Sequence, residues 1–598
     1  MAGTVWGRGV SIVGLMPDAD AAFAALAQST VDGLLERRPE RATVLGEHAH
    51  DGRLTIGTSA HYEELARWCA GRLAEVQGID MGPLSAEYRV DAQILFAELE
   101  RVLFATTELR EHEWNPMLAN PGRAIYLLLA RDFAPLPARL DSLAKRLAAV
   151  PEALAAARSV AAARMPQVHL ETAISQFEGT ERLIGAELDR ILAAAPDGTA
   201  SPGTASPGVA SRSLVPAGLA PARAAALDAL AEHRRWLEQR LADGVRDESF
   251  RDPRIGPDLF ARKLHHTLES GTSPAELLAR AQADLAETTG QITETAARLE
   301  PGAGAGGGAV GAGAGGGSAS LVRRVLDELA ADAPDDRTIL GLVGRDYHQA
   351  LAFIEETGLV TTVDDLVDII EMPEIDRGVA VAYCDAPGPL EADGQPTFVA
   401  VSPTPRDWAE GRVRSFYREY NRHLVQNLVV HEAMPGHVLQ LAHARRFRGG
   451  TPVRAAFWSG SFVEGWAVYA EELMARHGYP GEGNPDAVRM QQLKMRLRTI
   501  INTILDVRVH CGDLSESSAM ELMTGPGFQE EGEAAGKWRR AQLTATQLST
   551  YYVGYTEVSD LITRLRAKRP ELTERELHDE VLAHGSPAVR HLRSLLLS

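Results

Sequence analysis

Leu428-Val429-Val430-His431-Glu432-Ala433-Met434-Pro435-Gly436-His437 joins an apolar run to two histidines that flank a glutamate. Two imidazoles and a carboxylate are what a hydrolytic zinc site needs: neutral ligands and a group that deprotonates water. The histidines are six residues apart, not four as in the familiar H-E-x-x-H helix. An unbroken helix would separate them by about 240°. Since Pro435-Gly436 can interrupt the helix, we expect His437 to turn back toward His431; the alternative is two unrelated histidines.

A third ligand is expected from the segment Phe462-Val463-Glu464-Gly465-Trp466-Ala467-Val468-Tyr469-Ala470-Glu471. Its apolar residues recur at helical spacing, and Glu464 and Glu471 share one side of the helix. A carboxylate among apolar residues is costly unless it is paired or binds a metal. We therefore expect Zn²⁺ to be held by His431, His437 and Glu464, with Glu471 orienting a histidine. Two solvated helix carboxylates are the alternative.

These two segments carry a family resemblance. The patterns H-E-A-x-P-G-H-x-x-Q at 431–440 and E-G-W-A-x-Y-A-E at 464–471 resemble the bacterial family called domain of unknown function 885. That family is similar to largely helical zinc metallopeptidases of the thimet-oligopeptidase and thermostable-carboxypeptidase type. Segments 39–48 and 547–554 resemble its terminal signatures. Val438 and Leu548 depart from its pattern, which leaves the substrate pocket undetermined.

The resemblance also implies residues that act on the substrate. Glu432 would be the general base that passes a proton to the leaving amine. His510, at the end of a segment that resembles the family's D-x-x-x-H, and Tyr551 would stabilise an oxyanion, with Tyr552 as the competitor of Tyr551. Packed core residues are the alternative for each of them. Arg498 or Arg508 could bind a substrate carboxylate.

Composition predicts a mainly α fold, because aromatic residues are 6% of the chain and alanine and leucine abound. Apolar periodicity predicts helices near 18–38, 60–78, 85–113, 137–195, 222–245 and 274–299. The β-branched segments 379–383 and 397–401 predict a small hairpin or sheet next to the active-site helix. It could hold an extended peptide or simply stabilise the fold.

Two low-complexity stretches, 196–215 and 301–320, cannot bury a core. We expect them to be flexible insertions in a single large domain, 1–598, whose catalytic segment is 410–560. Interdomain linkers are the alternative.

Charge and cysteine content restrict the partners. The net charge is −20 with no basic run, which argues against nucleic acid and anionic membranes as partners. The three cysteines form no C-x-x-C motif, so neither a disulfide framework nor a cysteine zinc site is expected. The apolar stretch 10–16 is short for a signal peptide, and no stretch approaches the roughly 18 apolar residues of a membrane span. We expect a cytoplasmic protein; the sequence does not indicate its oligomeric state.

The sequence therefore predicts a zinc-dependent hydrolase that cleaves peptide bonds of short peptides. A metal-dependent enzyme acting on a non-peptide small-molecule amide is the first alternative. A non-catalytic helical binding protein is the second.

Overall fold

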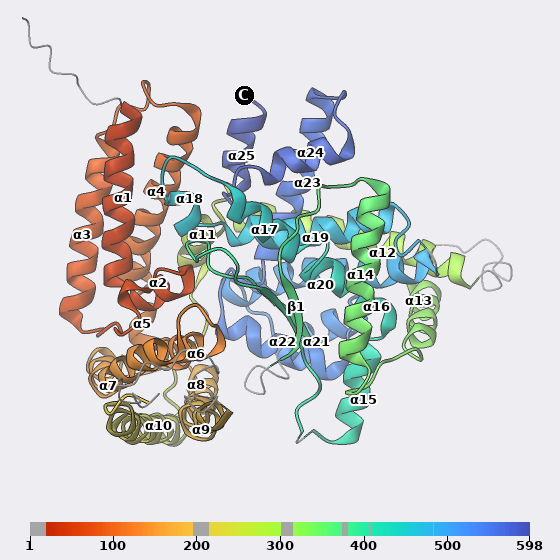
Figure 1. Ribbon diagram of the computed structural model, residues 1–598. Helices are drawn as coiled ribbons and strands as arrows, with labels where there is room; N and C mark the ends of the chain where they lie inside the picture. Colours follow the sequence, from red (N-terminus) through yellow and green to blue (C-terminus); the bar gives the residue numbers. More distant parts are fainter. Residues whose placement is uncertain (1–18, 195–214, 301–314, 373–380, 407, 482) are drawn as a thin grey trace, which may run out of the picture.

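The computed structural model describes residues 19–194, 215–300, 315–372, 381–406, 408–481 and 483–598. Figure 1 shows a mainly helical molecule with a small sheet near its middle, which confirms the predicted fold class. The N-terminal helices lie to one side of this sheet, and most helices from α14 onward lie around it and on the other side.

The helices of the N-terminal half are α1 (Ala19–Arg37), α2 (Pro39–Leu45), α3 (Ser59–Gln77), α4 (Ala86–Phe104), α5 (Glu111–Trp114), α6 (Gly122–Ala130), α7 (Leu136–Val160), α8 (Gln167–Arg182), α9 (Leu188–Ala194), α10 (Leu219–Asp247), α11 (Pro257–Leu268) and α12 (Pro274–Leu299). Those that follow are α13 (Gly315–Leu329), α14 (Ile339–Thr357), α15 (Glu410–Glu419), α16 (Arg422–Glu432), α17 (His437–Arg446), α18 (Val453–Ala456), α19 (Gly460–Arg476), α20 (Pro485–Cys511), α21 (Glu516–Thr524), α22 (Glu531–Leu543), α23 (Thr550–Lys568), α24 (Glu574–Leu582) and α25 (Val589–Leu596).

Several expected helices match their observed bounds closely, among them α1, α3 and α12. The single helix expected over 137–195 is wrong. It is divided into α7, α8 and α9. Pro166, which lacks a backbone donor, precedes α8 in an extended conformation, and a π-helical turn (Leu183–Glu187) with Gly185 outside helical geometry separates α8 from α9. The helix expected over 85–113 ends at Phe104, where a π-helical turn (Ala105–Leu109) leads to Arg110 in the left-handed conformation.

The sheet consists of β1 (Val367–Glu371), β2 (Ala382–Asp385) and β3 (Thr397–Val401), in the order β1-β3-β2. β1 pairs parallel with β3, and β2 pairs antiparallel with it, with Cys384 opposite Val399. The strand expected at 397–401 is confirmed. The strand expected at 379–383 instead begins at Ala382, and positions 379–380 lie outside the described residues. β1 was not expected, because its acidic ends mask its short apolar centre.

The low-complexity predictions fall largely outside the described residues, at 196–214 and 301–314. The prediction of a flexible insertion over 301–320 is wrong for positions 315–320. They form the start of α13, where helical geometry continues from Leu321 and its neighbours back into the glycine-rich stretch.

The largest apolar core joins the sheet to α14, α16, α17, α19 and the helices from α23 to the C-terminus. Its members include Phe462 and Trp466 on α19, which are fully buried. α19 packs along α23 and also against α16. Burial of this apolar surface holds α16 and α19 side by side and thereby positions the histidine motif against the glutamate segment.

Candidate metal centre

The histidine motif is built on a break between two helices. α16 ends at Glu432 and α17 begins at His437, as the Pro435-Gly436 pair predicted. The chain folds back so closely that the Gly436 amide donates to the carbonyl of Val430 over 2.9 Å. A Cβ atom at Gly436 would collide with the carbonyl oxygens of Val430 and His431. Glycine is therefore needed here for close backbone approach.

A buried tryptophan fixes α19 against this break. The indole nitrogen of Trp466 donates to the carbonyl of Pro435 over 2.8 Å. The Ser459 hydroxyl caps the helix by accepting a hydrogen bond from the amide of Phe462. Because Glu464 precedes Trp466 by two residues, the same contact sets the position of Glu464 relative to the histidines.

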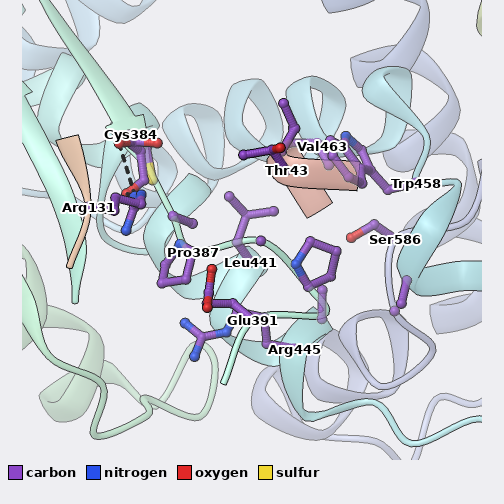
Figure 2. Close-up of a pocket in the computed structure, with 18 of the residues that line it drawn as sticks. Thr43, Arg131, Cys384, Pro387, Glu391, Leu441, Arg445, Trp458, Val463 and Ser586 are labelled. Carbon is purple, nitrogen blue, oxygen red and sulfur yellow. Dashed lines mark hydrogen bonds and ion pairs between the residues drawn. The ribbon is translucent and has the colours of Figure 1, made fainter. Parts of the chain in front are cut away.

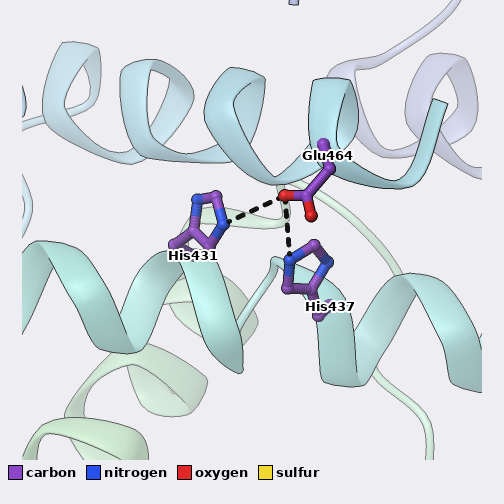
Figure 3. Close-up of side chains that lie close together, drawn as sticks. All are labelled: His431, His437 and Glu464. Atoms are coloured by element: carbon purple, nitrogen blue, oxygen red, sulfur yellow. Dashed lines mark ion pairs between the residues drawn. The ribbon is translucent and has the colours of Figure 1, made fainter. Parts of the chain in front are cut away.

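The three expected ligands converge, as Figure 3 shows. Oε2 of Glu464 lies 3.5 Å from Nε2 of His431 and 3.5 Å from Nε2 of His437. One ligand atom from each residue lies within 4.8 Å of the other two. Two ligands about 2.1 Å from a tetrahedral zinc ion would be about 3.4 Å apart. Oε2 of Glu464 is buried and has no hydrogen-bond partner among the described residues, so this donor set fits a zinc ion.

The protonation tendencies of the cluster follow from its burial and its charges. Burial alone would lower the pKa of His431, but the nearby carboxylates of Glu464 and Glu471 outweigh it and raise that pKa well above its usual value. Burial would raise the pKa of Glu464, but the two imidazoles outweigh it and lower that pKa. Without metal, the site therefore favours an ionised Glu464 carboxylate beside a protonated His431 imidazole. A bound metal cation would take the place of the proton on that imidazole.

Glu471 orients His431 as expected. Its Oε1 lies 2.8 Å from Nδ1 of His431, and its Oε2 accepts from the side-chain amide of Asn427 over 2.7 Å. The residue is 3% exposed. The sequence reasoning missed Asn427, although its position one helical turn before His431 could have indicated it. With Nδ1 held by a carboxylate, Nε2 of His431 is directed at the common point of the three ligands.

We expect Glu471→Gln to weaken zinc binding by about 10- to 100-fold, because an uncharged amide raises the basicity of His431 less and cannot accept from both His431 and Asn427. Competition with a chelating dye would measure the affinity. Glu472→Gln, on the same helix but paired with Arg496, is the matched control and should keep the wild-type affinity. Equal affinity of Glu471→Gln and wild type would show that Glu471 does not position the ligand.

Glu432 points toward the sheet. Its Oε2 accepts a hydrogen bond from the backbone amide of Cys384 on β2 over 3.0 Å. Burial raises the pKa of Glu432, and the neighbouring imidazole of His431 opposes this rise. A carboxylate with raised proton affinity, fixed by one oxygen beside a metal site, suits a general base. The contact with Cys384 was not foreseen, because a backbone amide leaves no mark in the sequence.

Of the two tyrosines, Tyr551 is the one whose pKa responds to the charge of Glu464. The Tyr552 hydroxyl donates to Asp284 over 2.6 Å, away from the cluster. Burial raises the pKa of Tyr551, and the next cause is the nearby carboxylate of Glu464. A glycine contact between α19 and α23 explains this proximity, because a Cβ on Gly465 or Gly554 would collide with the backbone of the opposite helix.

We expect Gly554→Ala to destabilise the protein by roughly 1–3 kcal/mol or more, because the added methyl group pushes α23 away from Ser461 and Gly465. Thermal unfolding would measure the effect. Gly290→Ala on α12 is the matched control, since a Cβ there meets no atom within 4 Å and should be neutral or stabilising. Similar melting temperatures for the two variants would contradict the close-packing argument.

The comparisons with known proteins agree with the motifs. The model of the family described as bacterial protein of unknown function (DUF885) matches residues 39–596. This chain is a member of the DUF885 family. A search of curated proteins finds no match.

Two solved structures resemble this DUF885 protein over nearly its whole length. A candidate lipoprotein of unknown function from Shewanella oneidensis is 27% identical, with a TM-score of 0.78, and the match covers 96% of this chain and 100% of that one. A candidate lipoprotein from Colwellia psychrerythraea shares the fold at 14% identity and a TM-score of 0.76, covering 97% and 99%. Among the described residues, no helix has the length and apolar character to cross a membrane.

Other predicted site residues of the DUF885 chain lie elsewhere. Nε2 of His510 is 3.0 Å from the carbonyl oxygen of Ala541 and 3.1 Å from that of Thr544, and its ring stacks on Phe260. The structure thus places His510 in the core between helices, and its described contacts do not include the three metal ligands. Arg508 is exposed, whereas Arg498 is mostly buried and pairs with Glu533.

Two cavities are lined by residues that contact or flank the candidate site. One, shown in Figure 2, has a volume of about 270 Å³, and its lining includes Cys384, which contacts Glu432, and Val463, which precedes Glu464. A larger cavity of about 830 Å³ extends between the N-terminal helices and the start of α19, and reaches Thr550. Trp458 lines both cavities. The larger one has a size that suits a short chain or a small molecule.

Proposed function

We propose that this DUF885 protein is a zinc-dependent hydrolase of amide bonds in short peptides. The observation that carries the proposal is the buried Oε2 of Glu464, which has no hydrogen-bond partner among the described residues and lies 3.5 Å from Nε2 of both His431 and His437. Glu432, in the same motif, supplies the base that hydrolysis requires. The resemblance of the motifs to helical zinc metallopeptidases supports the same reaction.

Each residue has a defined part in this proposal. Zinc held by His431, His437 and Glu464 would polarise a water molecule and lower its pKa toward neutrality. Glu432, aligned by the amide of Cys384, would take a proton from the attacking water and pass it to the leaving amine. The Tyr551 hydroxyl, whose pKa responds to Glu464, would donate to the oxygen on which negative charge develops.

The sheet edge offers a place for an extended substrate. β2 is an edge strand, and the amide of Cys384 turns away from β3 toward Glu432. The adjoining cavity of about 270 Å³ is lined largely by apolar side chains such as Leu441, Phe447 and Trp458. A peptide that adds to this edge would present its main-chain amide near Glu432 and one side chain to the cavity.

The decisive experiment is zinc-dependent turnover. We expect the zinc-loaded protein to cleave members of a mixed library of peptides three to eight residues long, followed by mass spectrometry. A chelator should stop cleavage, and added zinc should restore it. Zinc binding without cleavage of any peptide would reject the peptidase and favour the small-molecule amide. Failure to bind zinc would reject both enzymes and leave the helical binding protein.

The cytoplasm is the compartment we propose for this protein. The three cysteines are unpaired in the structure, as expected in a reducing compartment. The two solved relatives are described as candidate lipoproteins, which is the competing assignment. Fractionation of cells that express the natural chain would decide between them. A lipoprotein would sediment with the membranes and enter the detergent-rich phase when the membranes are extracted by detergent phase separation.

A further inference from the structure

A row of charged side chains runs along one face of α22. Glu533, Lys537 and Arg540 are spaced by four and three residues and therefore share this face. Arg498 of α20 lies opposite and forms an ion pair with Glu533. Lys537 is 6% exposed, and the side chain of Arg498 is 13% exposed. Three cations thus gather in a largely buried region.

This row begins near the start of α23. Arg540 donates a hydrogen bond to the side chain of Gln547 over 2.8 Å, four residues before Tyr551, and the carboxylate of Glu464 contributes to the raised pKa of Tyr551. At the other end, Arg498 opposes the rise of the pKa of Tyr420 that burial causes. Tyr420 packs with Val381 and Ala382, just before Cys384, whose amide binds Glu432. The cations therefore lie between the start of α23 and the residue that packs on β2.

The positive charge of this row is not balanced by its described neighbours. The carboxylate of Glu533 faces three cations, and the nearest carboxylate oxygen to Lys537 is that of Glu533 at 3.9 Å. Glu419, the other carboxylate near Lys537, is neutralised by Lys494 at 2.8 Å.

Hydrogen-bonding capacity is also left over. The ammonium of Lys537 is 3.9 Å from the carboxylate of Glu533, beyond hydrogen-bond distance, and Nη1 of Arg498 is buried without a partner among the described residues. Burial lowers the pKa of Lys537, and the positive charge of Arg498 lowers it further. Such an arrangement is costly in the free protein and becomes favourable when an anion enters.

We propose that Arg498, Lys537 and Arg540 form a subsite for a carboxylate of the substrate, which rests on the hydrolase proposed above. Arginine offers a planar pair of donors and lysine a compact charge, the combination that fits a carboxylate. The carboxylate comes either from a free C-terminus or from an acidic side chain. In both cases the subsite would hold the substrate on the Tyr551 side of the metal ligands.

Binding of 3-phenylpropionate, compared with its uncharged analogue 3-phenylpropanol, tests the subsite without turnover. By calorimetry we expect the wild-type protein to prefer the acid by at least about tenfold in Kd, because hydrogen bonds to a charged carboxylate are stronger than those to a hydroxyl group. Lys537→Met should abolish this preference while its melting temperature stays equal or rises, since the substitution removes an unbalanced buried charge. A purely structural lysine would instead lower the melting temperature and leave the preference intact.

Two lysines serve as controls. Lys568→Met, at the exposed end of α23, should keep both the preference and the melting temperature. Lys494→Met is the opposite control: it should lower the melting temperature and also weaken the preference, because it frees the carboxylate of Glu419 near Lys537. Equal Kd values for acid and alcohol in the wild-type protein, or an unchanged preference in Lys537→Met, would overturn the subsite.

Peptide pairs then identify the source of the carboxylate. Ala-Ala-Phe against Ala-Ala-Phe-amide tests a free C-terminus, and Ala-Glu-Phe-amide against Ala-Gln-Phe-amide tests an acidic side chain. For each pair we compare kcat/KM of the charged peptide with that of the uncharged peptide. The pair with the larger ratio, if that ratio falls in Lys537→Met, identifies the source of the carboxylate. A ratio near one in both pairs would contradict the subsite. Acid binding through Lys537 without cleavage of any peptide would keep the subsite and reject the hydrolase, so the two proposals fail separately.

Discussion

Glu432→Gln should retain zinc at the wild-type stoichiometry while its turnover of peptides falls by about 10²- to 10⁴-fold, the usual contribution of a general base. The glutamine side chain is nearly isosteric, and its amide oxygen can still accept from the Cys384 amide, so the local structure should persist. An amide cannot accept the proton of the attacking water. Turnover is measured by peptide hydrolysis at saturating zinc, and zinc content by elemental analysis of the same sample.

The matched control for this variant is Glu472→Gln, which changes a glutamate on α19 that pairs with Arg496. It should keep both zinc and most of the turnover. If Glu432→Gln loses zinc, Glu432 is a ligand and the roles assigned to Glu432 and Glu464 are wrong. If it keeps both zinc and turnover, another residue is the base.

Glu464→Gln should weaken zinc binding by more than about 100-fold, beyond the range expected for a residue that merely orients a ligand. It removes the one charged donor of the three, whose Oε2 lies 3.5 Å from the Nε2 atoms of both histidines. His431 and His437 alone would leave a tetrahedral zinc ion with two protein ligands. A chelator competition series and the loss of zinc on gel filtration would measure the change.

The comparison with Glu471→Gln makes this result specific. Both variants neutralise a glutamate of α19 close to His431, so a general loss of charge would weaken zinc binding equally in the two. Direct ligation requires the larger loss in Glu464→Gln. Unchanged zinc affinity in Glu464→Gln would mean that the metal, if bound, takes its third ligand from elsewhere.

The short-range pattern of the sequence was sufficient to predict which three residues meet at the candidate metal centre. Pro435-Gly436 between the histidines predicted the break that the structure contains, and Trp466 and its neighbours predicted the helix that carries Glu464. Both inferences depend on local rules: which backbone conformations a residue allows, and which side chains share a helix face. The mainly α fold followed from the same periodicity.

Contacts between distant elements could not be derived in this way. The choice of Tyr551 over Tyr552 depends on how closely α23 approaches α19, which the facing Gly465 and Gly554 permit. The placement of His510 against backbone carbonyls corrects the role that its motif suggested.

The sequence by itself determined the donor atoms of the candidate metal centre and the helices that carry them. Tertiary structure alone decided their surroundings: the Cys384 amide that aligns Glu432, the tyrosine whose pKa responds to Glu464, and the unbalanced cation of Lys537. The physical reason is that helical periodicity fixes neighbours along one element, whereas helix packing depends on the fit of whole surfaces. Those surfaces are assembled from residues hundreds of positions apart.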